Sequence, residues 1–474
     1  MINRLLFPLF LICGIASTPV FSAESSGIAE DLSEEDKLYG LSLFWKEASY
    51  NFAFFDQVPN LDFDSAYREY IPRVLATENT YEYYRELMKF NALLQDGHTN
   101  VYLPEGLSAQ YEDWPAVYMT EANQEAIVTK VDVALQAEIP LGSSIISVEG
   151  VDLETHLKTN IMPYIASSTE HILWDLAVKN TLDGPADSTV NFTIKTPSGE
   201  LKEVSLRRNS RNKNIEVASL ELPKIDISLK MLPSDMELFE FRWLENDLAY
   251  IALNGFHDEA IVENFKAAYP EIKKAKGLII DLRFNGGGNS NIGAEILSYL
   301  TNQDLEGSIW KTRKHVAAYK AWGSFGGEHE KYARDDAWEF GSMGRLEAQE
   351  GDNHIVPTYV LIGRYTGSAA EDFLVYADKV EHFTTIGEKT YGSTGQPIFF
   401  DLPGGGSFRI CTKRDTYPDG REFVGYGISP DILIERLPEH LIREEDIVYH
   451  RAVEEITREI KTEIQPVVSQ NPRL

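Results

Sequence analysis

Cysteine and long apolar runs are almost absent from this chain of 474 residues. It contains two cysteines, Cys13 and Cys411, and no run of 18 apolar residues beyond position 23. A mature chain that begins after residue 23 keeps Cys411 alone, so we expect no intramolecular disulfide. Without a long apolar run, we expect no helix that spans a membrane.

Positive charge is also scarce. The chain has 44 Lys and Arg residues against 74 Asp and Glu residues, which gives a formal net charge of −30 at pH 7. Such a charge repels nucleic-acid phosphates and anionic lipid headgroups, so we expect no nucleic-acid partner. The hydrophobic share of 43% and the charged share of 25% are typical of soluble globular proteins. The length is enough for about two to four domains.

The N-terminus has the pattern of a secretory signal. Arg4 precedes an apolar run over 5–16, and the small residues Ser22 and Ala23 follow it. This run is too short to cross a bilayer as a mature helix. We therefore predict a cleavable, bacterial-type signal peptide over 1–23 and a soluble protein that is periplasmic or secreted.

Segments with different residue patterns follow the signal. Apolar residues at three-to-four spacing over 30–105 predict a helical N-terminal domain. Short β-rich runs over 110–210 resemble a PDZ domain, and a generic β domain without a ligand is the alternative. Apolar strands alternate with amphipathic helices over 238–437, which indicates an α/β core. An insertion or lid is expected over about 312–355, and a C-terminal helical segment over 438–474.

A serine follows one of the apolar strands, at the first turn of a predicted helix. Ser368 lies in the run Gly367-Ser368-Ala369-Ala370-Glu371. As an N-cap, its oxygen would accept a free backbone N–H. As a nucleophile, it would use the same backbone N–H groups to stabilise an oxyanion. This segment alone leaves both interpretations open.

A glycine-rich turn follows another apolar strand, in the run Asn285-Gly286-Gly287-Gly288. It could be a tight turn, a phosphate-binding loop or a turn that stabilises an anion. A phosphate loop would need a Lys-Ser/Thr ending or the G-x-G-x-x-G spacing, and neither is present. An anion-stabilising turn is favoured because it would face Ser368 at the carboxyl ends of parallel strands, where ligands usually bind.

Together these segments resemble peptidase family S41, the C-terminal processing and tricorn-type serine peptidases. The motifs that carry the resemblance occur in the family's order: Asp281-Leu282-Arg283 with Asn285-Gly286-Gly287-Gly288, Gly367-Ser368-Ala369-Ala370-Glu371, Ile386-Gly387-Glu388-Lys389-Thr390-Tyr391-Gly392, and Gly425-Tyr426-Gly427-Ile428-Ser429-Pro430-Asp431-Ile432. The resemblance implies a multidomain α/β fold with helices at the N-terminus, a PDZ-like domain and a catalytic core of the ClpP/crotonase-like type.

The resemblance also implies an activity and its residues. Ser368 would be the nucleophile of a serine endopeptidase that acts on peptides or unfolded proteins. The N–H of Ala369 and that of Gly286 or Gly287 would form the oxyanion hole. Scattered histidines without an H-E-x-x-H pattern predict no metal site, and no cofactor is expected.

The residue available as general base differs from that in the better-known branch of the family. Processing-type members have a lysine where this chain has Ser393, and a serine cannot act as a base at neutral pH. The tricorn-like branch instead uses a histidine that precedes the PDZ-like domain, and His98 holds that place. An imidazole with a pKa near 6.5 can accept the serine proton and return it to the leaving amine. Lys389 is the alternative base.

The residue that orients His98 stays open, because Gly97 and Val424 stand where tricorn-like members have a serine and a glutamate. The candidates are Asp96, Glu371 and Asp372. Two other functions are also open: an inactive S41-like scaffold that binds peptides through its PDZ-like domain, and a hydrolase of a non-peptide acyl substrate.

Overall fold

The centre of the molecule is a mostly parallel β-sheet. The structure is a computed structural model that describes residues 31–464 except 212, 221–236 and 352, so the predicted signal over 1–23 lies outside the described residues. The strand order is β11-β12-β13-β18-β19-β23; β11 is antiparallel to β12 and the other neighbours are parallel. The strands are Phe239–Trp243 (β11), Leu248–Leu253 (β12), Gly277–Asp281 (β13), Thr358–Ile362 (β18), Phe383–Gly387 (β19) and Ile432–Leu433 (β23).

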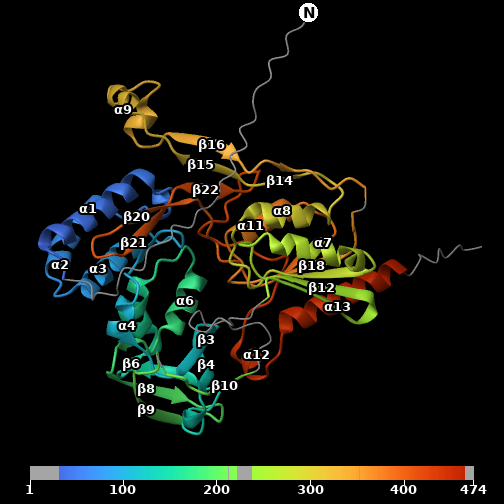
Figure 1. The fold of residues 1–474 in the computed structure, drawn as a ribbon, viewed down its shortest axis with the longest axis horizontal. Coiled ribbons are helices and arrows are strands. Elements are labelled where there is room, and N and C mark those ends of the chain that lie inside the picture. Colours follow the sequence, from blue (N-terminus) through green and yellow to red (C-terminus); the bar gives the residue numbers. More distant parts are fainter. Residues whose placement is uncertain (1–30, 212, 221–236, 352, 465–474) are drawn as a thin grey trace, which may run out of the picture.

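Helices cover both faces of this sheet (Figure 1). Every residue of β12, β13 and β18 is buried, which explains their continuous apolar runs. On one face Ile251 packs in the same core as Phe265, and on the other Tyr250 packs with Val448. The expected α/β fold class is confirmed. The helices on the first face are Ala260–Ile272 (α7), Ser290–Ser298 (α8) and Ala369–Ala377 (α11), and that on the second is Ile447–Ile464 (α13).

A small sheet joins the N-terminal helical part of the chain to the C-terminal part. The N-terminal helices have the side-chain N-caps Ser33, Asp62 and Asn79, each of which accepts a backbone N–H of the first turn. They pack beside the sheet β1-β21-β20, in which β1 is antiparallel to β21. The rings of Phe44 and Phe408 lie 5.1 Å apart across this contact. The elements are Glu34–Asn51 (α1), Phe63–Leu75 (α2), Thr80–Ala92 (α3), Asn100–Tyr102 (β1), Pro397–Asp401 (β20) and Ser407–Cys411 (β21).

A second sheet, which is antiparallel and has the order β10-β4-β5-β8-β9, lies between these two parts in sequence. Strand β3 pairs with β4, and helix α6 packs along β3. Trp174 and Val178 of α6 share a core with Phe192 of β8. The main elements are Val117–Ala122 (β3), Glu125–Asp132 (β4), Ser144–Val148 (β5), Glu170–Lys179 (α6), Thr189–Lys195 (β8), Leu201–Arg207 (β9) and Val217–Ser219 (β10).

The segment predicted as an insertion contains a projecting hairpin (Figure 1). Strands β15 (Ile309–Arg313) and β16 (Trp338–Ser342) pair antiparallel, and β15 also pairs with β22 (Lys413–Thr416). Short helices α9 (Ala317–Gly323) and α10 (Glu330–Ala333) form its tip.

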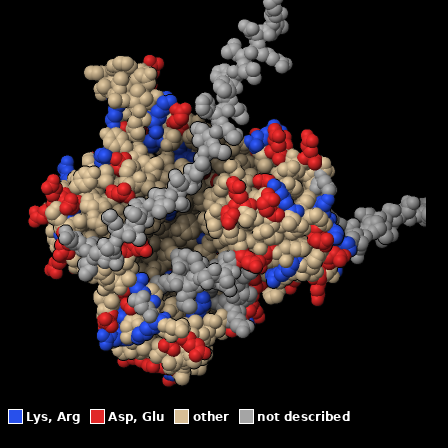
Figure 2. Space-filling model, viewed as in Figure 1, with Lys and Arg blue, Asp and Glu red and all other residues tan. Residues whose placement is uncertain are grey.

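Acidic side chains gather on the outer faces of the N-terminal helices and of the α/β core (Figure 2), in agreement with the net charge of −30. Among the helices that the structure describes, none combines the length and the apolar character that a membrane span requires.

Candidate active site

Ser368 lies in the tight turn between β18 and α11. Its φ of 54° and ψ of −121° differ from the extended conformation of an ordinary N-cap. Such a conformation costs a non-glycine residue about 1–3 kcal/mol and persists where the surrounding structure holds it, most often at functional sites. The residue is half-buried and thus accessible to a substrate.

The glycine-rich turn packs directly against Ser368. A Cβ atom added at Gly287, whose φ is +103°, would lie 2.6 Å from the Cβ of Ser368 and 2.9 Å from the N of Ala369. Only glycine permits this approach. The N–H of Gly287 donates to Oδ1 of Asn285 at 3.0 Å. Gly286 is exposed at the same turn. The structure therefore packs Gly287, one of the two predicted oxyanion-hole glycines, against Ser368 and the N of Ala369.

His98 approaches the same turn from the N-terminal part of the chain. Its Nδ1 lies 2.6 Å from Oγ of Ser393. The carbonyl oxygen of Ser393 accepts the N–H of Ser368 at 3.2 Å. The predicted nucleophile and the predicted base therefore contact the same residue, Ser393, which is fully buried.

The surroundings of His98 disfavour its charged form. Burial, followed by the positive charges of Arg409 and Lys413, lowers the pKa of His98 to about 4. The imidazole is therefore neutral at pH 7, which is the form that can accept a proton.

Glu371 holds together the turns on either side of Ser368. Its Oε2 accepts the backbone N–H of Ser368 at 3.0 Å and that of Ser393 at 3.2 Å. Its Oε1 accepts the Thr390 hydroxyl at 2.6 Å and the Gly392 N–H at 2.8 Å. Burial raises the pKa of Glu371 to about 8, and these four donors oppose that rise.

The carboxylates considered as partners of His98 bind other groups. Asp96 accepts hydroxyl hydrogens from Thr99 at 2.6 Å and Ser168 at 3.1 Å. Asp372 accepts those of Ser290 at 2.7 Å and Ser308 at 3.0 Å. Both carboxylates therefore hold hydroxyl groups, and none of these hydrogen bonds involves the His98 ring.

The alternative base, Lys389, is exposed, whereas the next residue, Thr390, is buried. The structure therefore places Lys389 at the surface and not in the buried turn that holds Ser393.

The N-terminus of α6 links the second sheet to both turns of the site. Oγ of Ser168 accepts the N–H of Gly97 at 2.8 Å. The Thr169 hydroxyl donates to the carbonyl oxygen of Tyr391 at 3.1 Å, and Nε2 of His171 lies 2.8 Å from the carbonyl oxygen of Thr390. The second sheet therefore contacts the segments that carry His98 and Ser393.

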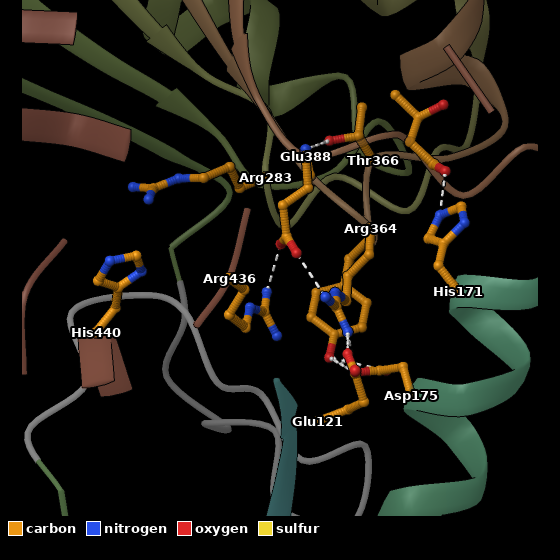
Figure 3. A network of polar contacts seen from close by, with 12 residues as sticks. Glu121, His171, Asp175, Arg283, Arg364, Thr366, Glu388, Arg436 and His440 are labelled. Carbon is orange, nitrogen blue, oxygen red and sulfur yellow. Dashed lines mark hydrogen bonds and ion pairs between the residues drawn. The ribbon is translucent and has the colours of Figure 1, made fainter. Parts of the chain in front are cut away.

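A buried ionic network reinforces this link (Figure 3). Arg364, which follows β18, contacts Asp175 of α6 at 3.2 Å and Glu388 at 2.5 Å, and it also pairs with Glu121 at the end of β3. Glu388 in turn accepts from Arg436 at 2.7 Å. Since Arg364 lies in the segment that leads to Ser368, the network joins this segment to the second sheet.

The Asp281-Leu282-Arg283 motif has a structural role in this fold. Arg283 contacts Asp281 at 2.8 Å and Asp446 at 2.7 Å, and all three side chains are buried. These contacts tie the end of β13 to the segment that precedes α13.

Sequence reasoning missed the contact of Ser393 with the His98 ring. It had identified Ser393 only as a residue unable to replace a lysine base. The sequence does contain a signal for this contact: a hydroxyl residue stands at the place of the lysine base, in a chain that has a histidine as candidate base.

An accessible serine at a strained strand-to-helix turn, with a glycine turn packed against it and a neutral imidazole in contact with Ser393, is typical of a serine hydrolase with an α/β core. Comparison with known proteins narrows this class. Residues 247–434 match the model of peptidase family S41.

Curated relatives agree with this match. The chain is 23% identical over 400 residues to a carboxyl-terminal-processing protease of Picosynechococcus sp., and the match covers 83% of each chain. It is 27% identical over 203 residues to a carboxy-terminal-processing protease of Bartonella bacilliformis, covering 41% of each chain.

Solved structures share the fold. The crystal structure of mature CPAF superposes with a TM-score of 0.69 at 13% identity, covering 92% of this chain and 99% of that one. A putative peptidase from Parabacteroides merdae gives a TM-score of 0.52 at 17% identity, covering 90% of this chain and 97% of that one. The α/β core over 247–434 is thus of the S41 type, and the protein is a serine-type peptidase.

Proposed function

We propose that this protein is an exported serine endopeptidase in which Ser368 is the nucleophile and His98 the general base. The observation that carries the proposal is the shared contact with Ser393, whose hydroxyl meets the His98 ring at 2.6 Å and whose carbonyl oxygen accepts the Ser368 N–H at 3.2 Å. A serine hydroxyl is activated for attack on a carbonyl when a neutral imidazole takes its proton.

Acylation then follows the chemistry of a serine-histidine pair. His98 takes the proton of the Ser368 hydroxyl as Oγ attacks the carbonyl carbon of the scissile peptide bond. The N–H groups of Ala369 and Gly286 stabilise the resulting oxyanion. We favour Gly286 over Gly287 because the Gly287 N–H already donates to Asn285. His98 passes its proton to the leaving amine, and an acyl-enzyme remains.

Deacylation reverses these roles. A water molecule loses a proton to His98 and attacks the acyl carbon. The second tetrahedral intermediate collapses, His98 returns the proton to Ser368, and the carboxylic acid product leaves. The same two N–H groups stabilise the oxyanion in both steps.

The substrate class is peptides or unfolded proteins. Two relatives are named carboxy-terminal-processing proteases, which supports the carboxyl-terminal part of a polypeptide as the region that is cut. The second sheet, as a PDZ-like domain, would recruit or present an extended peptide. Ser168 and Thr169, which immediately precede its helix α6, contact both turns of the site, so a peptide bound there could influence catalysis.

Export rests on the signal pattern of the first 23 residues. Expression of the full chain in a bacterium, followed by fractionation and N-terminal sequencing, tests it. We expect a periplasmic or secreted protein that starts at Ala23 or Glu24. A chain in the cytoplasm that retains Arg4 would contradict export and leave the chemistry of the site unaffected.

Labelling with a fluorophosphonate tests the site. We expect the wild type to react, Ser368→Ala to remain unlabelled and His98→Gln to react at least 100-fold more slowly, since general base catalysis contributes about 10²–10⁴ in rate. Lys389→Ala, which removes an exposed amine, is the matched control and should react like the wild type.

The same experiment separates the other functions. A folded wild type that is not labelled, yet still binds peptides, would be an inactive scaffold. A labelled enzyme that cleaves esters and no peptides would be a hydrolase of a non-peptide acyl substrate. If Lys389→Ala is not labelled and His98→Gln is labelled like the wild type, the lysine is the base.

A further inference from the structure

The hydroxyl of Ser393 is placed to control the His98 ring. Ser393 is fully buried, and its Oγ lies 2.6 Å from Nδ1 of His98. We propose that Ser393 is a positioning residue that holds the His98 ring in the tautomer with hydrogen on Nδ1, so that Nε2 accepts the proton of Ser368. This inference rests on the proposed function, in which His98 is the base.

The tautomer follows from the chemistry of the two groups. A serine hydroxyl can donate one hydrogen and can also accept hydrogen bonds, whereas a neutral imidazole has one donor and one acceptor nitrogen. If Nδ1 donates to Ser393, Nε2 is unprotonated and can take the Ser368 proton. If Ser393 donates to Nδ1, Nε2 carries the hydrogen and cannot act as a base. Catalysis by His98 therefore needs Ser393 as the acceptor.

The same hydrogen bond is retained during the reaction. When His98 becomes an imidazolium, both ring nitrogens carry hydrogen, and Nδ1 continues to donate to Ser393. The ring therefore does not have to turn between accepting the proton and passing it on. A site is preorganised when its hydrogen-bond donors, here Nδ1–H of His98, do not have to move during the reaction.

Ser393 can perform this role because its own position is fixed. Its N–H donates to Oε2 of Glu371 at 3.2 Å, and the same oxygen accepts the N–H of Ser368 at 3.0 Å. The side chain of Glu371 therefore positions both Ser368 and the residue that contacts His98. Close packing adds to this, since a Cβ atom at Gly97 would lie 3.2 Å from Oγ of Ser393.

The tautomer of His98 in the wild type tests the inference directly. With histidine labelled by ¹⁵N, long-range ¹H–¹⁵N spectra at pH 7 report which ring nitrogen carries hydrogen. The signal of His98 is assigned by its loss in His98→Gln. We expect Nδ1 to be protonated in the wild type. A wild-type ring with hydrogen on Nε2 would overturn the inference.

The variant Ser393→Ala tests the consequence for catalysis. Alanine keeps the backbone bonds to Glu371 and Ser368 and removes only the hydroxyl. We expect kcat for a peptide to fall about 10- to 100-fold with little change in KM, together with a mixture of His98 tautomers. Thr394→Val is the matched control, because it removes a neighbouring buried hydroxyl that donates to Asp415 rather than to His98. We expect it to retain kcat within about threefold.

The outcomes separate this inference from the proposed function. A fully active His98→Gln enzyme would remove the proposed function itself. An inactive His98→Gln enzyme beside a folded Ser393→Ala enzyme with wild-type kcat would overturn the role of Ser393 alone. Thermal unfolding of each variant establishes that the comparison is made between folded proteins.

Discussion

Asn100 and Arg409 are paired partners across the antiparallel strands β1 and β21, and Nε of Arg409 donates to the Asn100 side chain at 2.8 Å. Arg409 also donates to the carbonyl oxygen of Gly97 at 3.2 Å. This pairing holds the residue before His98 against the C-terminal part of the chain. His98, from the N-terminal part of the chain, thereby lies against Ser393, whose carbonyl oxygen accepts the N–H of Ser368.

The loss of activity at low pH, the acid limb of the pH profile, should occur at the lowered pKa of His98. Because the pKa is about 4, the imidazole stays unprotonated well below pH 6, so kcat/KM should fall with an apparent pKa near 4. The profile of peptide cleavage between pH 3.5 and 8 measures this. A limb at 6.5 or above would contradict the described environment of the ring.

The charge of Lys413 contributes to this low pKa. Removing a nearby positive charge favours the protonated imidazole, so Lys413→Met should move the acid limb upward, by up to about one pH unit. Lys274→Met removes a lysine whose side chain is 62% exposed and that pairs with Glu271 elsewhere on the surface, and it should leave the limb unchanged. Equal shifts in both variants would mean that overall charge, and not proximity, sets the pKa.

Protonation of His98 should also weaken the fold in acid. The folded pKa of about 4 is below the unfolded value of 6.5, so the unfolded chain binds a proton first. The free energy of unfolding therefore decreases as the pH falls from about 6.5 to about 4, by at most about 3 kcal/mol. In urea titrations at pH 7 and pH 4.5, His98→Gln should lose less unfolding free energy than the wild type. Identical losses in the two proteins would contradict this prediction.

The contact between α6 and the core should depend on Asp175. Burial opposes its ionisation, but Lys179 and Arg364 outweigh this effect and lower the pKa of Asp175 to about 2. Asp175→Asn leaves two buried cations without this partner, so thermal unfolding should report a loss of about 3–5 kcal/mol. Glu154→Gln breaks an exposed pair with Lys158, and its effect should stay below about 0.5 kcal/mol. Comparable losses in both variants would contradict the importance of the buried network.

A side chain at position 97 should displace the base. A Cβ atom there would lie 2.8 Å from Cε1 of Tyr391, so Gly97→Ala should lower kcat by at least tenfold and cost about 1–3 kcal/mol of stability. Gly363→Ala is the control, because a Cβ atom there would lie 3.7 Å from its nearest neighbour, Cγ of Arg283, and the substitution should be tolerated. Full activity in Gly97→Ala would show that the turn can shift without moving His98.

Much of the fold could be predicted from local patterns. The buried strands β12, β13 and β18 are continuous apolar runs, and the helices that follow them have amphipathic spacing. The turn at Ser368 could be located because glycine and small residues follow a strand. These features depend on residues close together in the sequence, so local sequence patterns predict them.

The partner of the histidine could not be predicted in this way. The sequence points to three carboxylates, because charge is the usual signal of a base's partner. The observed contact of the His98 ring is instead a neutral hydroxyl, which has no local sequence pattern. Likewise, the contacts of Ser168 and Thr169 with the site arise from packing between separate sheets.

The amino-acid sequence by itself determined the α/β core, the serine at its turn and the family motifs, because periodicity and glycine placement act over short spans. Only the tertiary structure decided that Ser393 joins His98 to Ser368. That contact depends on the pairing of β1 with β21 and on the hydrogen bonds of Glu371, which bring together residues distant along the chain.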